Sequence, residues 1–247
     1  MENVTPRYAL IGSGRAAQHL EFYLKSLGLS VRAWSRKLEP RPGAEWVTVA
    51  REATHVWALV SDRAVEPVIQ DARAALQKAD VDPARLIWLH ASGNLVTPLA
   101  HGCHPLVSFA SGRLYEPDFY RRLPIIVDRD APPFDQLLSG LPNPHFKVDP
   151  RQRPLYHALC VLSGCFTTLL WQKLFRDFET RLLMPGKIAA PYLESVMKNL
   201  LADPDRAATG PLNRGDVSTI QSNLAALEGD PFQKIYRAFV EAESPRK

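Results

Sequence analysis

Short apolar runs alternate with helical patterns over the first 128 residues of the chain. The runs have the length and the aliphatic or aromatic content typical of buried strands: Tyr8–Ile11, Ser30–Trp34, His55–Val60, Leu86–His90 and Leu123–Asp128. Residues 15–27 and 64–77, between them, place apolar side chains at helical spacing. Glu45–Val49 is a candidate for one more short strand. Strands separated by helices predict an α/β fold with a doubly wound, mostly parallel sheet.

The pattern changes after about residue 150. From Arg151 onward no run rich in β-branched residues has the length of a strand, and long helical patterns follow one another: 152–178, 186–202, 216–228 and 231–242. The stretch 132–150 is interrupted by prolines, as connections between domains often are. We therefore expect a Rossmann-like domain over residues 1–149 and an all-α domain over residues 150–247.

The first predicted strand passes into the first predicted helix through GSGRAA, a G-x-G-x-x-A pattern that ends at Ala17. In such a βαβ unit the first glycine permits a tight turn, the second lets the backbone approach a pyrophosphate, and a small third residue lets the helix pack on the strand. The helix N-terminus adds N–H donors and a positive dipole end. The residues predicted to hold the pyrophosphate of a dinucleotide are Gly12, Ser13, Gly14, Arg15 and Ala16. A glycine turn without a ligand is the alternative.

The end of the second predicted strand indicates which nucleotide is bound. An NAD site typically has Asp or Glu there, whereas Trp34 is followed here by Ser35, Arg36 and Lys37, with no carboxylate before Glu39. A hydroxyl and two cations suit a 2′-phosphate, which predicts NADP rather than NAD. A solvated basic loop is the alternative. The missing acid also disfavours a methyltransferase, whose S-adenosylmethionine needs a carboxylate for its ribose hydroxyls.

Polar residues concentrate in HASGNL (His90–Leu95) and GCHPLVSF (Gly102–Phe109), after a predicted strand. Ligand-binding groups of doubly wound sheets gather at the carboxyl ends of the strands. A reductase that passes hydride to a C=O or C=N bond also needs a proton donor, a role for which histidine is suited. We predict that His104 handles the proton and that Ser92 orients it or binds the substrate. A buried structural imidazole is the alternative for His104.

Composition narrows the choice of partners. The net charge of +4, from 30 basic and 26 acidic residues, is too small and scattered for a nucleic-acid groove but fits an anionic small molecule. Cys103, Cys160 and Cys165 lack zinc spacing, so we predict reduced thiols, no metal and a cytoplasmic protein. The start of the chain has no signal-peptide pattern. The apolar stretch Leu155–Trp171 has 17 residues, short of the roughly 20 of a membrane span, so we expect a helix buried in a domain or subunit core and no membrane contact.

Several of these segments together resemble a family of Rossmann-like NADP-binding proteins with a C-terminal helical domain of unknown function. They are IGSGRAAQHL, HASGNL followed by GCHPLVSF, YHALCVLSG and TGPLNRGDVSTIQSNLAAL. The wider relatives are pyrroline-5-carboxylate reductases, prephenate dehydrogenases and 6-phosphogluconate-dehydrogenase-like enzymes. The resemblance implies a homodimer built through the C-terminal helices. It also supports roles for Ser92 and His104, because prephenate dehydrogenases use a Ser and the His of an HP motif.

The chain also departs from that family. Members tend to carry Ser-Asn where this chain has Gly164-Cys165, and His where it has Asn223. These replacements remove polar groups from the expected cleft and leave two hypotheses open. The first is an NADP(H)-dependent oxidoreductase acting on a small carbonyl or imine substrate. The second is a non-catalytic NADP-binding sensor or assembly protein.

Overall fold

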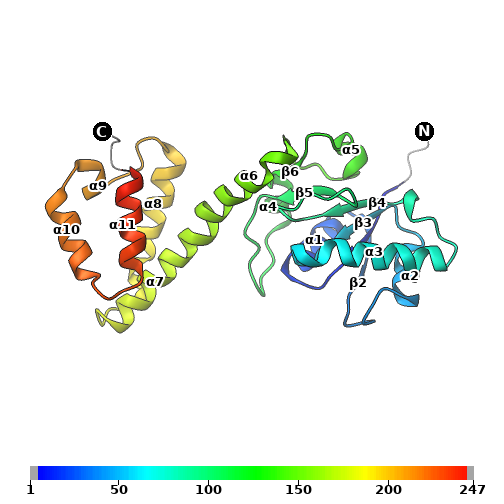
Figure 1. Ribbon diagram of the computed structural model, residues 1–247, viewed down its shortest axis with the longest axis horizontal. Coiled ribbons are helices and arrows are strands. Elements are labelled where there is room, and N and C mark those ends of the chain that lie inside the picture. The colour runs from blue at the N-terminus through cyan, green and yellow to red at the C-terminus, as the bar shows by residue number, and fades with distance from the viewer. Residues whose placement is uncertain (1–4, 244–247) are drawn as a thin grey trace. The chain divides into compact units, whose positions relative to one another are not determined.

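The computed structural model describes residues 5–243. Residues 1–4 and 244–247 lie outside it, so the prediction about a signal peptide at the start of the chain falls partly outside the described residues. The chain divides into two compact units, Met1–Thr167 and Thr168–Lys247 (Figure 1). The division falls inside a long helical run, further along the chain than residue 149.

The first unit is built on a seven-stranded sheet with the strand order β2-β1-β3-β4-β5-β6-β7. All neighbouring strands run parallel except the antiparallel pair β5 and β6. The strands are β1 (Arg7–Ile11), β2 (Ser30–Trp34), β3 (His55–Ala58), β4 (Ile87–His90), β5 (His101–Pro105), β6 (Ile125–Asp128) and β7 (His145–Val148). Because β2 and β3 flank β1 on opposite sides, the crevice at the carboxyl end of β1 is the switch point where such sheets bind ligands.

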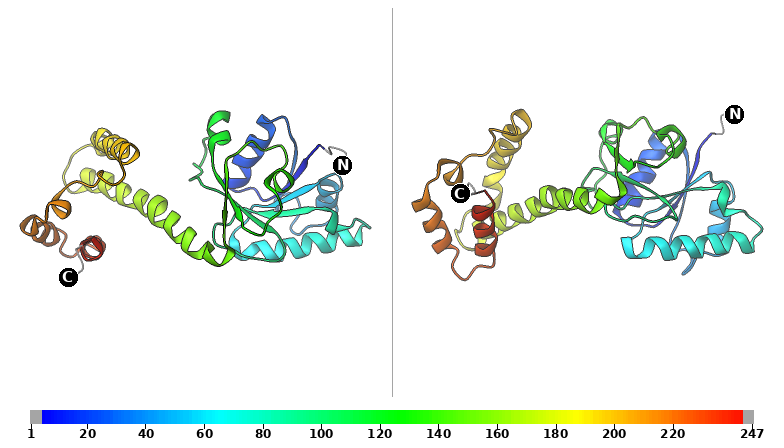
Figure 2. Two further views of the ribbon diagram at one scale, coloured as in Figure 1. Left: turned by 90° about the horizontal axis from the view of Figure 1, so that it is seen from above. Right: turned by 45° about the horizontal axis from the view of Figure 1, so that its top comes forward.

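Helices cover both faces of the sheet, as predicted for a doubly wound fold. One face carries α1 (Arg15–Ser26), α4 (Pro117–Arg122) and α5 (Phe134–Leu137), and the other carries α2 (Ala44–Ala50) and α3 (Asp62–Lys78). Figure 2 shows α1 (blue) and α3 (cyan) on opposite sides of the strands. Successive side chains of β1 divide between the two cores, Leu10 toward α1 and Ile11 toward α3, because the side chains of a strand alternate in direction. This explains why the strands read as continuous apolar runs.

The prediction of a strand at Glu45–Val49 is wrong, because these residues form α2. Trp46 and Ala50 are fully buried and lie four residues apart, on one face of a helix. The Trp46 indole packs edge-on against Trp34 and donates a hydrogen bond of 3.0 Å to the Ala72 carbonyl of α3. β-branched Val47 and Val49 suggested a strand, but tertiary packing overrode that local preference.

Two strands were not predicted. The stretch 132–150 contains α5 and β7, so it is part of the sheet rather than only a connection. The side chains of β7 are largely exposed, which gives an edge strand without the alternation that marks a half-buried one. His101–Pro105, expected to lie beyond a strand, is β5 itself.

The helical run from Pro150 to Thr180 connects the units. It comprises a 3₁₀ turn (Pro150–Gln152), α6 (Arg153–Cys160), a π-helical segment (Val161–Phe166) and α7 (Thr167–Thr180). This 31-residue run is, by length and composition alone, long and apolar enough to cross a membrane. Within this chain no domain core covers its apolar side chains, which are exposed: Leu155, Leu159, Leu162, Phe166, Leu169 and Leu170. The prediction that it is buried in a subunit core stays a prediction.

The second unit is helical, as predicted. After α7 it contains a 3₁₀ turn (Gly186–Ala189), α8 (Ala190–Ala202), α9 (Pro211–Arg214), α10 (Val217–Ala226) and α11 (Phe232–Glu243). Lys173 ties α7 to the turn before α11 through an ion pair of 2.6 Å with Asp230, and it pairs at 2.6 Å with Asp177 of its own helix. Asp216 caps α10 and accepts a 3.0 Å hydrogen bond from the Thr219 N–H.

Candidate functional site

The glycine turn lies at the carboxyl end of β1, in the crevice beside β3. Gly12 has φ = 137°, and its N–H donates to the Trp34 carbonyl at 2.9 Å. A Cβ atom on Gly12 would lie 2.3 Å from the Leu59 carbonyl oxygen, so no other residue fits this conformation and this close approach. The first glycine of the motif is therefore required by the backbone.

Gly14 and Ala17 fill the other two small positions. Gly14 is the N-cap of α1, and a Cβ atom there would meet no atom within 4 Å, so the space above the helix N-terminus is open. Ala17 is buried in the core between α1 and the sheet. The first N–H groups of a helix lack intrahelical partners, and here no side chain caps them. This arrangement fits a phosphate group approaching the turn.

Arg15 lies on α1 with its guanidinium exposed. Its Nη1 donates a long hydrogen bond of 3.4 Å to the Phe109 carbonyl, in the segment that follows β5. The same segment is held by His19, whose Nε2 lies 2.9 Å from the Ala110 carbonyl and whose ring stacks on Phe109. The residues after β5 thus lie against the first turns of α1, beside the glycine turn.

A pocket of about 370 Å³ opens beside the glycine turn, between the segment after β2 and the start of α3. Its lining includes Gly12, Trp34, Arg36 and Arg41, and also the Asp71 carboxylate. Ser35 and Lys37, predicted to share the 2′-phosphate with Arg36, do not line it; the Ser35 hydroxyl accepts a 3.4 Å hydrogen bond from the Lys37 N–H. Arg41 was not predicted, although it lies in the same basic segment of the sequence.

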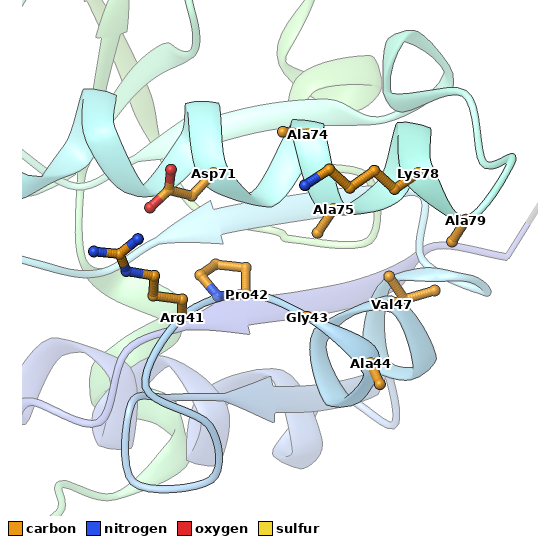
Figure 3. A pocket seen from close by; sticks show the side chains of 10 residues that line it. All are labelled: Arg41, Pro42, Gly43, Ala44, Val47, Asp71, Ala74, Ala75, Lys78 and Ala79. Carbon is orange, nitrogen blue, oxygen red and sulfur yellow. The ribbon is translucent and has the colours of Figure 1, made fainter.

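Arg41 also lines a larger groove of about 570 Å³ between α2 and α3 (Figure 3). The Arg41 and Asp71 side chains extend toward one another there, and Lys78 lies at the other end of the groove. Its remaining walls are mostly alanine and glycine. Neither Ser92 nor His104 lines this groove, so it is separate from the predicted site of chemistry.

His104 lies near the carboxyl end of β5, and its partner is Tyr156 of α6. The His104 Nδ1 atom is 2.6 Å from the Tyr156 hydroxyl oxygen, and the two rings meet at 80°. The His157 ring lies edge-on to His104, with the ring centroids 6.2 Å apart. Burial, then His157 and Arg153, lower the pKa of His104 to about 4, so the imidazole is neutral at pH 7.

Ser92 follows β4 and makes a different set of contacts. Its hydroxyl donates to the Asp62 carboxylate at 2.8 Å and accepts from the N–H groups of Asn94 and Leu95. Asp62 is the first residue of α3 and makes no capping bond there. The structure therefore gives Ser92 the partner Asp62, whereas Tyr156 is the side chain bonded to His104.

Gly93 follows Ser92 in the chain and lies beside the rings of His104 and His157. A Cβ atom there would lie 2.6 Å from His157 Cδ2 and 3.3 Å from His104 Nε2, so a side chain would occupy the space beside the imidazole. His90, at the end of β4, is fully buried, and its Nε2 has no hydrogen-bond partner among the described residues. Burial, reinforced by Arg153, lowers its pKa to about 4.

A buried ion pair attaches α6 to the sheet beneath this site. The Arg153 guanidinium is fully buried and pairs with Asp128 at the end of β6. It also donates to the carbonyl oxygens of Gly102 at 2.8 Å and Ser92 at 3.2 Å, while the Gly102 N–H donates to Asp128 at 2.9 Å. Arg153 thereby holds the segment after β4, strand β5 and the start of α6 together. Sequence reasoning missed Arg153, Asp62 and Tyr156.

The family-specific departures lie elsewhere. Gly164 and Cys165 belong to the π-helical segment and are exposed. Asn223 of α10 donates a 3.0 Å hydrogen bond to the Tyr236 hydroxyl of α11, a contact within the helical unit. Cys103, Cys160 and Cys165 are free thiols, and no cluster of His, Cys, Asp and Glu suited to a metal occurs within residues 5–243.

Known structures share this fold over nearly their whole length. A Bacteroides fragilis protein described as a proposed NADP oxidoreductase has a TM-score of 0.75 and 19% identity, with 98% of each chain covered. An Aspergillus terreus reductive aminase in complex with NADPH has a TM-score of 0.61 and 14% identity, covering 97% of this chain and 93% of its own. Plasmodium falciparum pyrroline carboxylate reductase with NADP bound has a TM-score of 0.55 and 11% identity, with 96% of each chain covered.

No curated protein matches the chain in sequence. Residues 128–243 match the model of a family described as a domain of unknown function, DUF2520. The predicted resemblance is thus confirmed: the chain has the Rossmann-like fold of NADP-binding oxidoreductases, followed by a C-terminal helical region.

Proposed function

We propose that the protein is an NADP(H)-dependent oxidoreductase that acts on a small carbonyl or imine substrate. The observation that carries the proposal is the glycine turn at the switch point of the sheet. Gly12 reaches the end of β3 at a distance that only glycine allows, and the N-terminus of α1 is open above Gly14. Both features favour a pyrophosphate at this turn.

The adenosine end of the cofactor fits the adjacent pocket. Arg36 and Arg41 supply two guanidinium groups, which suit a 2′-phosphate better than the ribose hydroxyls of NAD. Ser35 and Lys37, predicted from the sequence to share the 2′-phosphate with Arg36, belong to the same segment but do not line this pocket. The named cofactors of the structural neighbours, NADP and NADPH, point in the same direction.

The chemistry belongs at the carboxyl ends of β4 and β5. The cofactor, when bound, supplies the hydride; the chain supplies His104, Ser92 and Asp62 around the substrate. His104 offers a ring nitrogen to the substrate oxygen or nitrogen, and the Ser92–Asp62 pair offers a hydroxyl and a carboxylate. Reductive aminase and pyrroline carboxylate reductase, named among the neighbours, support a carbonyl or imine as substrate.

The proposal is tested by titrating the purified chain with NADPH and NADH and then following NADPH oxidation with panels of small ketones, aldehydes and cyclic imines. We expect micromolar NADPH binding and turnover of at least one compound. His104→Gln should lower kcat/KM by about 100-fold while NADPH still binds. Tight NADPH binding without turnover would favour the sensor, and S-adenosylmethionine binding without NADPH binding would favour a methyltransferase.

We further propose that the helical run 150–180 forms the interface of a homodimer. Six large apolar side chains along it are between 36% and 61% exposed, a patch of the kind that monomers rarely leave open to water. We also propose that the protein is soluble and cytoplasmic. Light scattering should give about twice the 27.6 kDa chain mass, whereas recovery only from detergent extracts would favour a membrane-bound protein.

A further inference from the structure

The sequence motif predicted a role for His104 but did not predict its contact with Tyr156, which the structure shows. Tyr156 is three residues after Arg153, so both side chains leave α6 on the same face. The buried pair of Arg153 with Asp128 fixes the start of this helix on the sheet. The Arg153–Asp128 ion pair, rather than the contacts of the Tyr156 side chain itself, therefore sets the position at which Tyr156 meets β5.

The geometry of the contact indicates which group donates. The separation of 2.6 Å is short for N–H···O but ordinary for an O–H donor. Burial, together with the neighbouring Cys160, raises the pKa of Tyr156, so its hydroxyl keeps the proton. His104 is neutral at pH 7 and has one nitrogen without a proton, which can accept. Tyr156 Oη–H thus donates to His104 Nδ1.

This donation determines the other nitrogen. If Nδ1 accepts, the single ring proton of neutral His104 is on Nε2. No hydrogen-bond partner of Nε2 occurs among the described residues, and a Cβ atom on Gly93 would lie 3.3 Å from it, so the glycine leaves this space uncovered. The Nε2–H group is then a free donor beside the segment that carries Ser92.

We propose that Tyr156 is a positioning residue that holds His104 as the neutral Nε2–H tautomer, so that His104 serves as a hydrogen-bond donor and not as an imidazolium acid. The role rests on the proposed oxidoreductase function, for which a neutral N–H would polarise the acceptor atom of a carbonyl or uncharged imine. The neutral imidazole keeps this proton, so the proton that the reduced oxygen or nitrogen takes up comes from water.

The charged and titratable groups around His104 agree with this role. His157 and Arg153 approach from α6, and His90 from β4; all three disfavour a positive charge on the imidazole. Asp62 of α3 opposes them, but its carboxylate accepts the Ser92 hydroxyl. The neutral form is therefore expected across the pH range above about 5.

The tautomer is measured by ¹⁵N NMR of the full chain labelled at its seven histidines, with the His104 signals assigned from His104→Gln. We expect a non-protonated Nδ1 and a protonated Nε2 at pH 7. In Tyr156→Phe the Nδ1–H form should rise to a comparable share. A protonated Nδ1 in the unaltered chain, or an unchanged ratio in Tyr156→Phe, would overturn the proposal. This measurement needs no substrate, so it is independent of the proposed function.

With a substrate in hand, Tyr156→Phe should lower kcat about 10-fold and leave KM and NADPH affinity within twofold. Tyr120→Phe is the matched control, because Tyr120 makes the same 2.6 Å contact with a histidine Nδ1, that of His19. A merely structural role would lower the stability of both variants alike and leave both kcat values unchanged, which would contradict the proposal.

Discussion

The glycine turn and the His104 site lie at the same edge of one sheet but are built from different parts of the chain. The turn is made of backbone: Gly12 approaches the Leu59 carbonyl, and Gly14 leaves the helix N-terminus open. The His104 site is made of side chains from β5, α3, α6 and the segment after β4. The turn therefore depends on six consecutive residues, whereas the His104 site depends on contacts across up to 61 positions of sequence. The two sites should fail separately.

The largest expected effect comes from a substitution that disrupts the His104 site alone. Arg153→Met leaves the Asp128 carboxylate buried without its partner, which should lower the free energy of unfolding by about 3–5 kcal/mol. Urea unfolding measures the loss. The double variant Arg153→Met/Asp128→Asn should recover part of it, because no unpaired charge remains. A single variant as stable as the unaltered chain would show that the ion pair does not anchor α6.

The next effect breaks the glycine turn alone. Gly12→Ala forces a side chain onto the Leu59 carbonyl at φ = 137° and should cost at least about 2 kcal/mol, with loss of NADPH binding. Gly14→Ala is the matched control: its backbone at φ = −75° accepts alanine, so its stability should change by less than about 1 kcal/mol while NADPH binding still weakens. Equal stability losses at both positions would contradict the assigned roles.

Acid should lower the stability that His90 and His104 contribute through the His104 site, and it should leave the glycine turn unaffected. The pKa values of His90 and His104 fall from 6.5 to about 4 on folding, so between these values the unfolded chain binds more protons than the folded one. Stability therefore rises with pH from 4 to 6.5, by up to roughly 3 kcal/mol for each histidine, and is flat above. Burial lowers the pKa of His55 too, so it contributes to the same slope. Unfolding curves across this range test the slope, which His104→Gln should reduce.

The smallest effect sharpens the account of the nucleotide pocket. Arg36→Ser and Arg41→Ser should each weaken NADPH binding roughly 10-fold without changing the affinity for NADH, because only NADPH carries the 2′-phosphate. Lys37→Ser is the control, since Lys37 does not line the pocket, and should change NADPH affinity less than twofold. Calorimetric titration gives all three values. A larger loss at Lys37 than at Arg41 would restore the set predicted from sequence alone.

Much of the fold could be predicted because it depends on local patterns. The parallel strands were recognisable as apolar runs, since both faces of the sheet are buried, and α1 began at the residue that follows the glycines. The prediction was wrong at Glu45–Val49, where burial of Trp46 against Trp34 favoured a helix over a strand. It was incomplete at β7, whose exposed edge position leaves no periodic signal.

The sequence by itself determined the order of strands and helices, the glycine turn and the change to an all-helical second half, because each of these is encoded by neighbouring residues and their spacing. Only the tertiary structure decided that His104 is hydrogen-bonded to Tyr156, that Ser92 is hydrogen-bonded to Asp62, and that Arg41 lines the same pocket as Arg36. Those contacts follow from which strands are adjacent in the sheet and where α6 is anchored by Arg153. Hydrogen bonds and ion pairs between distant residues act over a few ångströms of space and have no period along the chain, so no local sequence pattern predicts them.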